Sequence, residues 1–302
     1  MIDKSNKFDV QEFSLNLMNN ILLFRDELVH YSYNHSGYKA FSISDPKPRR
    51  IHKALVRDRL LHHAIYRILY PFFDRTFITD SYSCRIGKAS YKALGRFRTF
   101  VYKVSENHKK TVWILKCDIR KFFDNIDHKI LIDILNRYIS DQDIIWLLEN
   151  VIHSFSKTPG KGLPLGNLTS QLFVNIYMNE FDQFVKHGLK VKHYIRYADD
   201  FVILSQDKSW LDERLFKMGD FLQEKLKLDL HPDKISIRTI SSGVDFLGWV
   251  HFPKHRVLRT STRKRMIRRL AESSKPETLN SYLGLLKHGN TYKIRKSLKL
   301  KD

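Results

Sequence analysis

Cysteines and long apolar stretches are both scarce in this sequence. Its 302 residues include two cysteines, Cys84 and Cys117, which do not form a C-x-x-C pair. The sequence therefore predicts neither a zinc site nor a disulfide framework, and it favours a reducing compartment. No segment approaches the roughly 18 consecutive apolar residues of a membrane span. The N-terminus, MIDKSNKFDVQEFSLNLMNN, also lacks the basic and apolar regions of a signal peptide. These absences predict a cytoplasmic protein that does not enter a membrane.

Acidic residues are few relative to basic ones. The chain has 53 lysines and arginines against 32 aspartates and glutamates, a net charge of +21, and its pI is near 9.8. Residues 254–302 alone contain fifteen lysines and arginines and three acidic residues. A surplus of this size indicates a polyanionic partner, most simply a nucleic acid. The alternative is a basic surface that contacts only solvent.

Apolar residues make up 42% of the chain, enough for a substantial core. Their spacing predicts an amphipathic helix through residues 13–28 and further helices over 56–73 and 209–227. The run VWILKCD has the pattern of a buried strand, and Asp127 is a suitable N-cap for the helix that follows. Strands and helices follow one another in mixed order, so we expect an α+β fold.

Three aspartates interrupt or end these apolar strand patterns. Asp199 and Asp200 are adjacent within YIRYADDFVIL, and Asp118 ends VWILKCD. Asp-Asp is a common turn dipeptide, so a hairpin tip would explain the pair without any function. If the two strands are neighbours, however, three carboxylates meet at one edge of a sheet. There they repel one another unless cations bind them.

Two Mg²⁺ ions would satisfy such a cluster. Mg²⁺ prefers oxygen ligands and usually binds through one or two carboxylates together with substrate phosphates. Two ions about 3.5–4 Å apart can activate an attacking hydroxyl and stabilise the leaving oxygen of a phosphoryl displacement. Together with the basic charge, the three aspartates therefore predict a nucleic-acid polymerase.

At this level of detail the chain resembles the bacterial reverse transcriptases over roughly residues 40–260. The segment YADD resembles their YxDD box, and FLGWV resembles the strand that grips the primer end. The first and second palm motifs are matched by KCDIRKFFDNIDH and GLPLGNLTSQLFVNIYMNEFD. Two fingers motifs are matched by PKPRRI and SYSCRIGKA. All six motifs occur in the family's order.

The resemblance implies a right-hand polymerase, which is an α+β fold with fingers, palm and thumb. Residues 1–110 would form an N-terminal helix and the fingers. Residues 111–252 would form the palm with its antiparallel sheet, and 140–170 within them would contribute to the fingers. Residues 253–302 would form a small, basic, helical thumb.

The resemblance also implies roles for the aspartates. Asp118 and Asp199 would bind both Mg²⁺ ions, Asp200 would complete the ligand set, and the carbonyl of Ile119 would assist. These residues would catalyse the synthesis of cDNA from dNTPs on an RNA template and a primer.

Basic residues match the positions that hold the incoming triphosphate in this family. Arg49 and Arg85 would bind it, since the planar fork of arginine donates to phosphate in a bidentate manner. Lys47 or Arg50 could take the place of Arg49. Lys234 is a candidate for protonating pyrophosphate, but we favour a solvated surface lysine.

Phe123 falls where the family keeps an aromatic residue beneath the sugar of the incoming nucleotide. A ring at this position would clash with a ribose 2′-hydroxyl and so favour deoxynucleotides. The alternative is a core aromatic, which is the role that we expect for Phe122.

One departure from the common pattern points to a subgroup. Most reverse transcriptases have Gln-Gly and then Ser-Pro in the second palm motif, whereas this chain has Leu165-Gly166 and Ser170-Gln171. The pattern LGNLTSQ resembles the enzymes of diversity-generating retroelements, which copy RNA with errors at adenines. The resemblance implies that Leu165 and Gly166 help to bind the incoming dNTP near the nascent base pair. Two alternatives remain: a defence-associated reverse transcriptase that acts with a dedicated non-coding RNA, and a non-catalytic RNA-binding scaffold.

The C-terminal segment RTSTRKRMIRRL predicts a helix whose arginines Arg265, Arg268 and Arg269 contact backbone phosphate. Such contacts give affinity and salt dependence rather than sequence choice. The resemblance further implies a bacterial or phage-encoded protein. A small basic accessory protein or a structured non-coding RNA would help its short thumb to hold the duplex.

Overall fold

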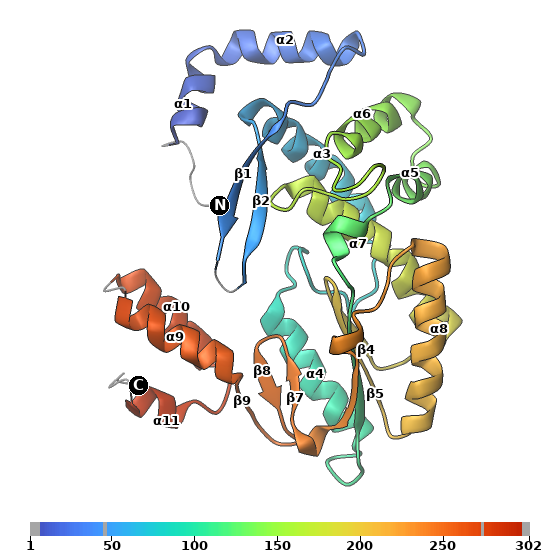
Figure 1. The fold of residues 1–302 in the computed structure, drawn as a ribbon, viewed down its shortest axis with the longest axis vertical. Coiled ribbons are helices and arrows are strands. Elements are labelled where there is room, and N and C mark those ends of the chain that lie inside the picture. Colours follow the sequence, from blue (N-terminus) through green and yellow to red (C-terminus); the bar gives the residue numbers. More distant parts are fainter. Residues whose placement is uncertain (1–6, 45–46, 273–274, 298–302) are drawn as a thin grey trace. The chain divides into compact units, whose positions relative to one another are not determined.

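The computed structural model describes residues 7–44, 47–272 and 275–297 (Figure 1). The chain divides into two compact units. Pro46 of the predicted PKPRRI motif lies outside the described residues. Unit 1 consists of Met1–Ile78, Lys121–Asp182 and Phe221–Leu228, and unit 2 of Thr79–Arg120, Gln183–Asp220 and Asp229–Asp302.

Unit 1 is mainly helical. Its elements are α1 (Phe8–Leu15), α2 (Leu17–Val29), the hairpin of β1 (Tyr38–Ile43) and β2 (Arg49–Ala54), α3 (Val56–Asp74), the 3-10 helix η1 (Phe122–Asn125), α5 (His128–Asn136), α6 (Gln142–His153) and most of α7 (Leu168–Gln183). Helix α8 (Lys208–Leu226) begins in unit 2 and ends in unit 1. The predicted helix over 56–73 is confirmed by α3, which buries a stripe of apolar residues. Asp127 caps α5 as predicted, because its carboxylate accepts a hydrogen bond from the Ile130 amide at 3.2 Å.

The prediction of one continuous N-terminal helix is wrong. The helix breaks at Asn16, whose φ of −119° and ψ of 37° are not helical. Asparagine competes for backbone hydrogen bonds and so favours helix ends over interiors. Across the break, the side chain of Asn20 in α2 donates to the carbonyl of Phe13 in α1 at 2.8 Å. Of the apolar residues that suggested the helix, only Phe24 is buried.

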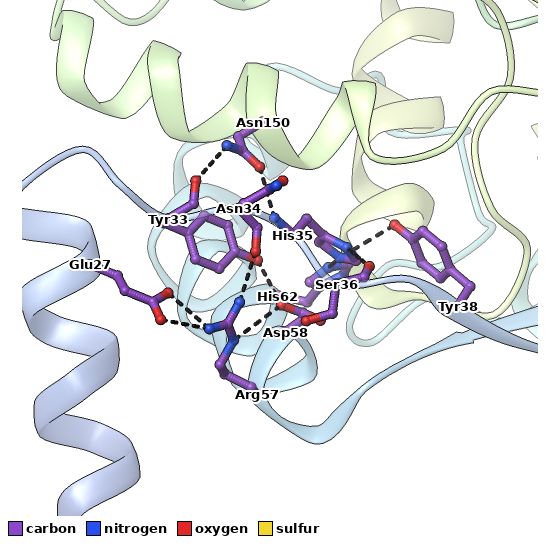
Figure 2. Close-up of polar contacts among 10 residues, drawn as sticks. All are labelled: Glu27, Tyr33, Asn34, His35, Ser36, Tyr38, Arg57, Asp58, His62 and Asn150. Carbon is purple, nitrogen blue, oxygen red and sulfur yellow. Dashed lines mark hydrogen bonds and ion pairs between the residues drawn. The ribbon is translucent and has the colours of Figure 1, made fainter.

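A partly buried polar network joins the segment after α2 to α3 and α6 (Figure 2). Asp58 is fully buried and accepts a hydrogen bond from the Tyr33 hydroxyl at 2.9 Å. Arg57 donates to both carboxylate oxygens of Glu27, at 2.8 and 2.9 Å. The side chain of Asn150 donates to the Tyr33 carbonyl at 2.7 Å. These contacts fix the N-terminal segment onto the rest of unit 1.

Unit 2 contains two antiparallel sheets. The first has the strand order β4-β5-β3-β6 and the second the order β7-β8-β9. The strands are β3 (Trp113–Asp118), β4 (Tyr194–Tyr197), β5 (Asp200–Ser205), β6 (Ser236–Thr239), β7 (Val244–Phe246), β8 (Trp249–His251) and β9 (Arg256–Leu258). The helices that lie wholly in this unit are α4 (Ser90–Val104), α9 (Thr260–Glu272), α10 (Pro276–Leu286) and α11 (Tyr292–Ser297).

The core of unit 2 forms between α4 and the first sheet. Helix α4 packs on β4 and β5, and its Phe97 and Phe100 are buried among the same apolar residues as Val202 of β5 and Phe246 of β7. The residues of β5 between its two ends are buried. A strand in this position is held in one register, because a slip of one residue would exchange its two faces. No helix among the described residues is long and apolar enough to cross a membrane.

Candidate active site

The predicted aspartates lie at the turn between β4 and β5 and at the end of β3. Tyr197 pairs with Asp200, so the hairpin closes through the two residues Ala198 and Asp199. Ala198 has φ of 57°, the left-handed conformation that tight two-residue hairpins require. Strand β5 then runs antiparallel to β3 in a register that sets Asp200 opposite Asp118.

A backbone hydrogen bond also joins the turn to the residue after β3. The amide of Ile119 donates to the carbonyl of Asp199 at 3.2 Å. The three carboxylates expected to converge therefore come from two neighbouring strands and the turn that begins one of them. The prediction that the two strands are neighbours is confirmed.

Two lysines lie beside these carboxylates. The ammonium of Lys234, in the 3-10 helix η3 (Pro232–Lys234), is 2.6 Å from Oδ1 of Asp118. Lys116 of β3 is 3.8 Å from Oδ1 of Asp200. The expectation that Lys234 is only a solvated surface residue is therefore wrong, because its side chain pairs with a predicted site carboxylate. The sequence showed no local signal for this pair, since its members are far apart along the chain.

The electrostatics reflect a surplus of negative charge at the turn. Burial, followed by the neighbouring carboxylates of Asp200 and Asp118, raises the pKa of Asp199 to about 6. Burial also raises the pKa of Asp200, an effect that nearby Lys116 opposes. A cation at this position would relieve the repulsion, so the site is suited to bind positive charge.

The donor set fits a hard divalent cation. Its ligand atoms are carboxylate oxygens, which Mg²⁺ prefers, and Asp118 already contacts one cationic group, the Lys234 ammonium. Among the described residues, no group of three or more His, Cys, Asp or Glu side chains that could hold a metal ion occurs. A Mg²⁺ site does not require three such side chains, because substrate phosphates and water complete its coordination.

Arg196 is a further residue of this site, and the sequence analysis did not single it out. It lies in β4, is fully buried, and donates to the carbonyl of Ala198 at 3.1 Å. It also donates to the Ser81 hydroxyl at 3.1 Å. The sequence signal that could have identified Arg196 was a charged residue within the apolar strand YIRY, because a buried charge needs hydrogen-bond partners. Arg196 acts as a positioning residue, because it holds the turn that carries Asp199.

Arg85, the predicted triphosphate ligand, belongs to the same unit as the aspartates. Its guanidinium donates to the carbonyl of Ser81 at 3.0 Å. The backbone of this loop pairs with β4, where the amide of Tyr82 donates to the Arg196 carbonyl at 3.0 Å. The loop that carries Arg85 is therefore attached to the strand that leads into the aspartate turn.

The remaining nucleotide-site candidates lie in unit 1. Arg49 is exposed and begins β2. Phe123 is half-buried in η1, whereas Phe122 beside it is 4% exposed. The carbonyl of Leu165 accepts from the amide of His52 in β2 at 2.8 Å.

Gly166, which follows Leu165, has a backbone that only glycine adopts easily. Its φ is +112°, and a Cβ there would lie 2.6 Å from Cγ2 of Ile51. Any side chain at this position would push the loop away from β2. This close approach explains why a glycine follows Leu165.

The predicted phosphate-binding arginines share α9 in unit 2. Arg268 and Arg269 are exposed, and Arg265 is half-buried. Arg268 lies 3.7 Å from Glu272 one turn later, and a pair as exposed as this one contributes little to stability.

Comparisons with known proteins find relatives of this chain. The chain is 26% identical to protein YkfC of Escherichia coli (strain K12), over 80% of this chain and 72% of YkfC. It is also 26% identical to the group II intron-encoded protein LtrA of Lactococcus lactis subsp. cremoris, over 76% of this chain and 47% of LtrA. The chain thus spans about half the length of LtrA.

Solved telomerase structures share the fold. Telomerase from Candida albicans, in complex with a TWJ fragment of telomeric RNA, matches with a TM-score of 0.54 and 13% identity, over 80% of this chain and 49% of that one. Apo telomerase from Candida tropicalis matches with a TM-score of 0.57 and 13% identity, over 77% of this chain and 50% of that one. The predicted right-hand polymerase fold is therefore confirmed. Residues 44–251 match the family described as reverse transcriptase (RNA-dependent DNA polymerase), and the chain belongs to this family.

Proposed function

We propose that this protein copies an RNA template into cDNA from dNTPs, with Asp118, Asp199 and Asp200 at the catalytic centre. The observation that carries the proposal is the register of β3 and β5, which sets Asp118 opposite Asp200 beside the turn that holds Asp199. The family and the basic charge of the chain support the same reaction. A non-catalytic scaffold would have no use for repelling carboxylates at one sheet edge.

The roles of the side chains follow from their chemistry. Asp118 and Asp199 would hold two Mg²⁺ ions, with Asp200 and the Ile119 carbonyl assisting, and this pair of ions supplies activation of the primer hydroxyl and stabilisation of the leaving oxygen. Lys234 neutralises Asp118 before substrate binds, at an Nζ–Oδ1 distance of 2.6 Å.

The substrate-facing roles in this proposal belong to four residues. Arg49 and Arg85 bind the triphosphate, and Phe123 excludes the ribose 2′-hydroxyl. Leu165 packs near the nascent base pair. In domain terms, residues 1–110 serve as fingers, 111–252 as palm and 253–302 as a basic thumb, whose α9 arginines contact the backbone of the primer–template duplex.

Within the family, we assign the chain to the error-prone enzymes of diversity-generating retroelements. The support is the sequence Leu165-Gly166 followed by Ser170-Gln171, where most reverse transcriptases have Gln-Gly and Ser-Pro. A small basic accessory protein or a structured RNA would then be a partner. Sequencing cDNA made from one RNA template tests the assignment: errors concentrated at template adenines support it. Uniformly accurate copying would favour a defence-associated enzyme instead.

The catalytic assignment is tested by Asp199→Asn. This change keeps the size of the side chain but removes one charged ligand, so cDNA synthesis with Mg²⁺ should fall below a few per cent of wild type, while the circular dichroism spectrum stays the same. The matched control is Asp207→Asn just past β5. Asp207 caps α8 by accepting from the Trp210 amide at 3.1 Å, and asparagine caps equally well. Activity of Asp199→Asn above a few per cent of wild type with Mg²⁺ would refute the proposed centre.

A further inference from the structure

Unit 2 contains a basic cavity. None of the residues assigned above to the proposed polymerase reaction lines it. Its volume is about 360 Å³, within the range of small-ligand sites. Three segments form its wall: α4, the turn between β8 and β9, and the loop between α10 and α11. The residues that carry the argument are Arg98, Lys254, Arg256 and Lys287, together with Phe252 and His255.

The charge of this cavity is positive and unneutralised. Arg98, Lys254, Arg256 and Lys287 line it, and no aspartate or glutamate does. None of these four side chains forms an ion pair with any residue that the structure describes. Arg96 on the same helix, by contrast, is paired with a carboxylate at 2.8 Å. Four cations gathered around one cavity repel one another, so an anionic ligand would stabilise the arrangement.

The electrostatic cost is visible in Arg256. Burial, and then the nearby guanidinium of Arg98, lower the pKa of Arg256. A phosphate group is the anion that such a cluster suits best, because arginine donates to its oxygens in a bidentate manner and lysine adds a compact charge.

The wall of the cavity is held in place before any ligand binds. Nε of Arg256 donates to the carbonyl of His288, and the amide of Asn290 donates back to the Arg256 carbonyl at 2.9 Å. Gly289 between them packs against the ring of Trp249 so closely that a Cβ would collide with it. The loop after α10 is therefore fastened to β8 and β9, and a preformed site loses less entropy on binding.

The cavity offers more than charge. The half-buried ring of Phe252 stacks on the exposed ring of His255, with centroids 4.9 Å apart and an interplanar angle of 15°. Flat aromatic surfaces of this kind stack with nucleobases.

We propose that this cavity binds a phosphate-bearing nucleotide, either free or within a nucleic-acid strand. The four cations hold the phosphate, and the Phe252–His255 pair receives the base. The site is separate from the aspartates of the proposed catalytic centre, and it does not depend on their function. Within a strand, it would give the protein a second hold on nucleic acid besides the α9 arginines.

The test measures binding to the full chain in EDTA, so that metal-dependent binding at the aspartates does not contribute. The probes are UMP, uridine and a fluorescent eight-nucleotide RNA. We expect the exposed double variant Lys254→Glu/Lys287→Glu to weaken binding of the phosphate-bearing probes at least about tenfold, because it replaces two of the four cations with negative charges. Uridine should not bind. Binding of both UMP and RNA identifies a nucleotide site, and binding of RNA alone identifies a strand as the ligand.

The matched control is Lys92→Glu/Lys208→Glu, which changes two exposed lysines of unit 2 outside the cavity and alters the net charge equally. If the control weakens RNA binding as much as the cavity variant does, only the overall charge matters and the proposal fails. Inorganic phosphate that displaces the probes as well as UMP does would also overturn it, because the base and sugar would then contribute nothing. Asp199→Asn should keep full probe binding, so failure here and failure of the proposed polymerase activity are distinguishable.

Discussion

His62 should make the stability of unit 1 depend on pH, through a directed chain of hydrogen bonds. In Figure 2, His62 of α3 lies next to His35, and their Nε2 atoms are 3.0 Å apart. His35 donates from Nδ1 to the Ser36 carbonyl, so its Nε2 is the acceptor in the neutral ring. His62 must then donate from Nε2, and its Nδ1 accepts from the Thr169 hydroxyl at 2.8 Å.

In this chain, an additional proton on His35 would set two N–H groups against each other. The Thr169 hydroxyl can turn to accept from a protonated His62, so burial opposes protonation of His62 more than the hydrogen bonds do. Burial, and then the neighbouring His35, lower the pKa of His62 from its ordinary 6.5 to about 4. Burial also lowers the pKa of His35. Both imidazoles are therefore neutral in the folded protein at pH 7.

The sign and the size of the effect follow from linkage. Because the folded pKa lies below the unfolded one, the stabilisation is fully present above pH 6.5 and is lost as the pH falls toward 4. A shift from 6.5 to about 4 corresponds to about 3 kcal/mol for His62. His62 is 2% exposed, so solvent screening reduces this figure little.

Urea denaturation at pH 7 and pH 4 provides the assay. The wild type should lose about 3 kcal/mol more free energy of unfolding over this interval than His62→Gln, which has no titrating ring. The control is His63→Gln, whose exposed side chain is the next one on the same helix, and it should behave like the wild type. An equal loss for wild type and His62→Gln would refute the reasoning.

Three further predictions concern the proposed reaction. Phe123→Ala should raise ribonucleotide incorporation about tenfold to two-hundredfold, as expected when packing no longer excludes a small group. Phe122 is 4% exposed, so Phe122→Ala should instead cost about 3–5 kcal/mol of stability. Unchanged rNTP/dNTP selectivity in Phe123→Ala would exclude a role of Phe123 in rejecting ribonucleotides. Leu165→Gln should reduce errors at template adenines about twofold to tenfold, because a polar side chain adds a hydrogen bond worth about 0.5–1.5 kcal/mol. Sequencing of the cDNA measures the errors, and a variant with lower activity but unchanged errors would assign Leu165 to loop packing alone. Replacing the three α9 arginines with alanine should weaken primer–template binding equally for all sequences and flatten its salt dependence by up to about one log–log unit per lost contact, whereas an unchanged salt slope would mark α9 as solvated surface.

Much of the fold could be predicted from local patterns, because apolar periodicity and helix capping depend on residues that are close together in the sequence. Apolar spacing located α3 and α8, and Asp127 marked the start of α5. The same reasoning failed at Asn16, where apolar residues at helical spacing continue across a break in the backbone. Periodicity reports which face a residue would occupy, but it does not report whether the helix itself continues.

For the candidate site, the sequence by itself determined which carboxylates stand at the ends of buried strands, since a charge in an apolar run is conspicuous. Only the tertiary structure decided what surrounds them. The register of β3 and β5 set Asp200 opposite Asp118, and the ion pair brought Lys234 to Asp118. The basic cavity likewise exists only because α4, the β8–β9 turn and the loop after α10 meet in the fold. Contacts between residues this far apart in the chain depend on strand pairing and core packing, and neither leaves a signal in the local sequence.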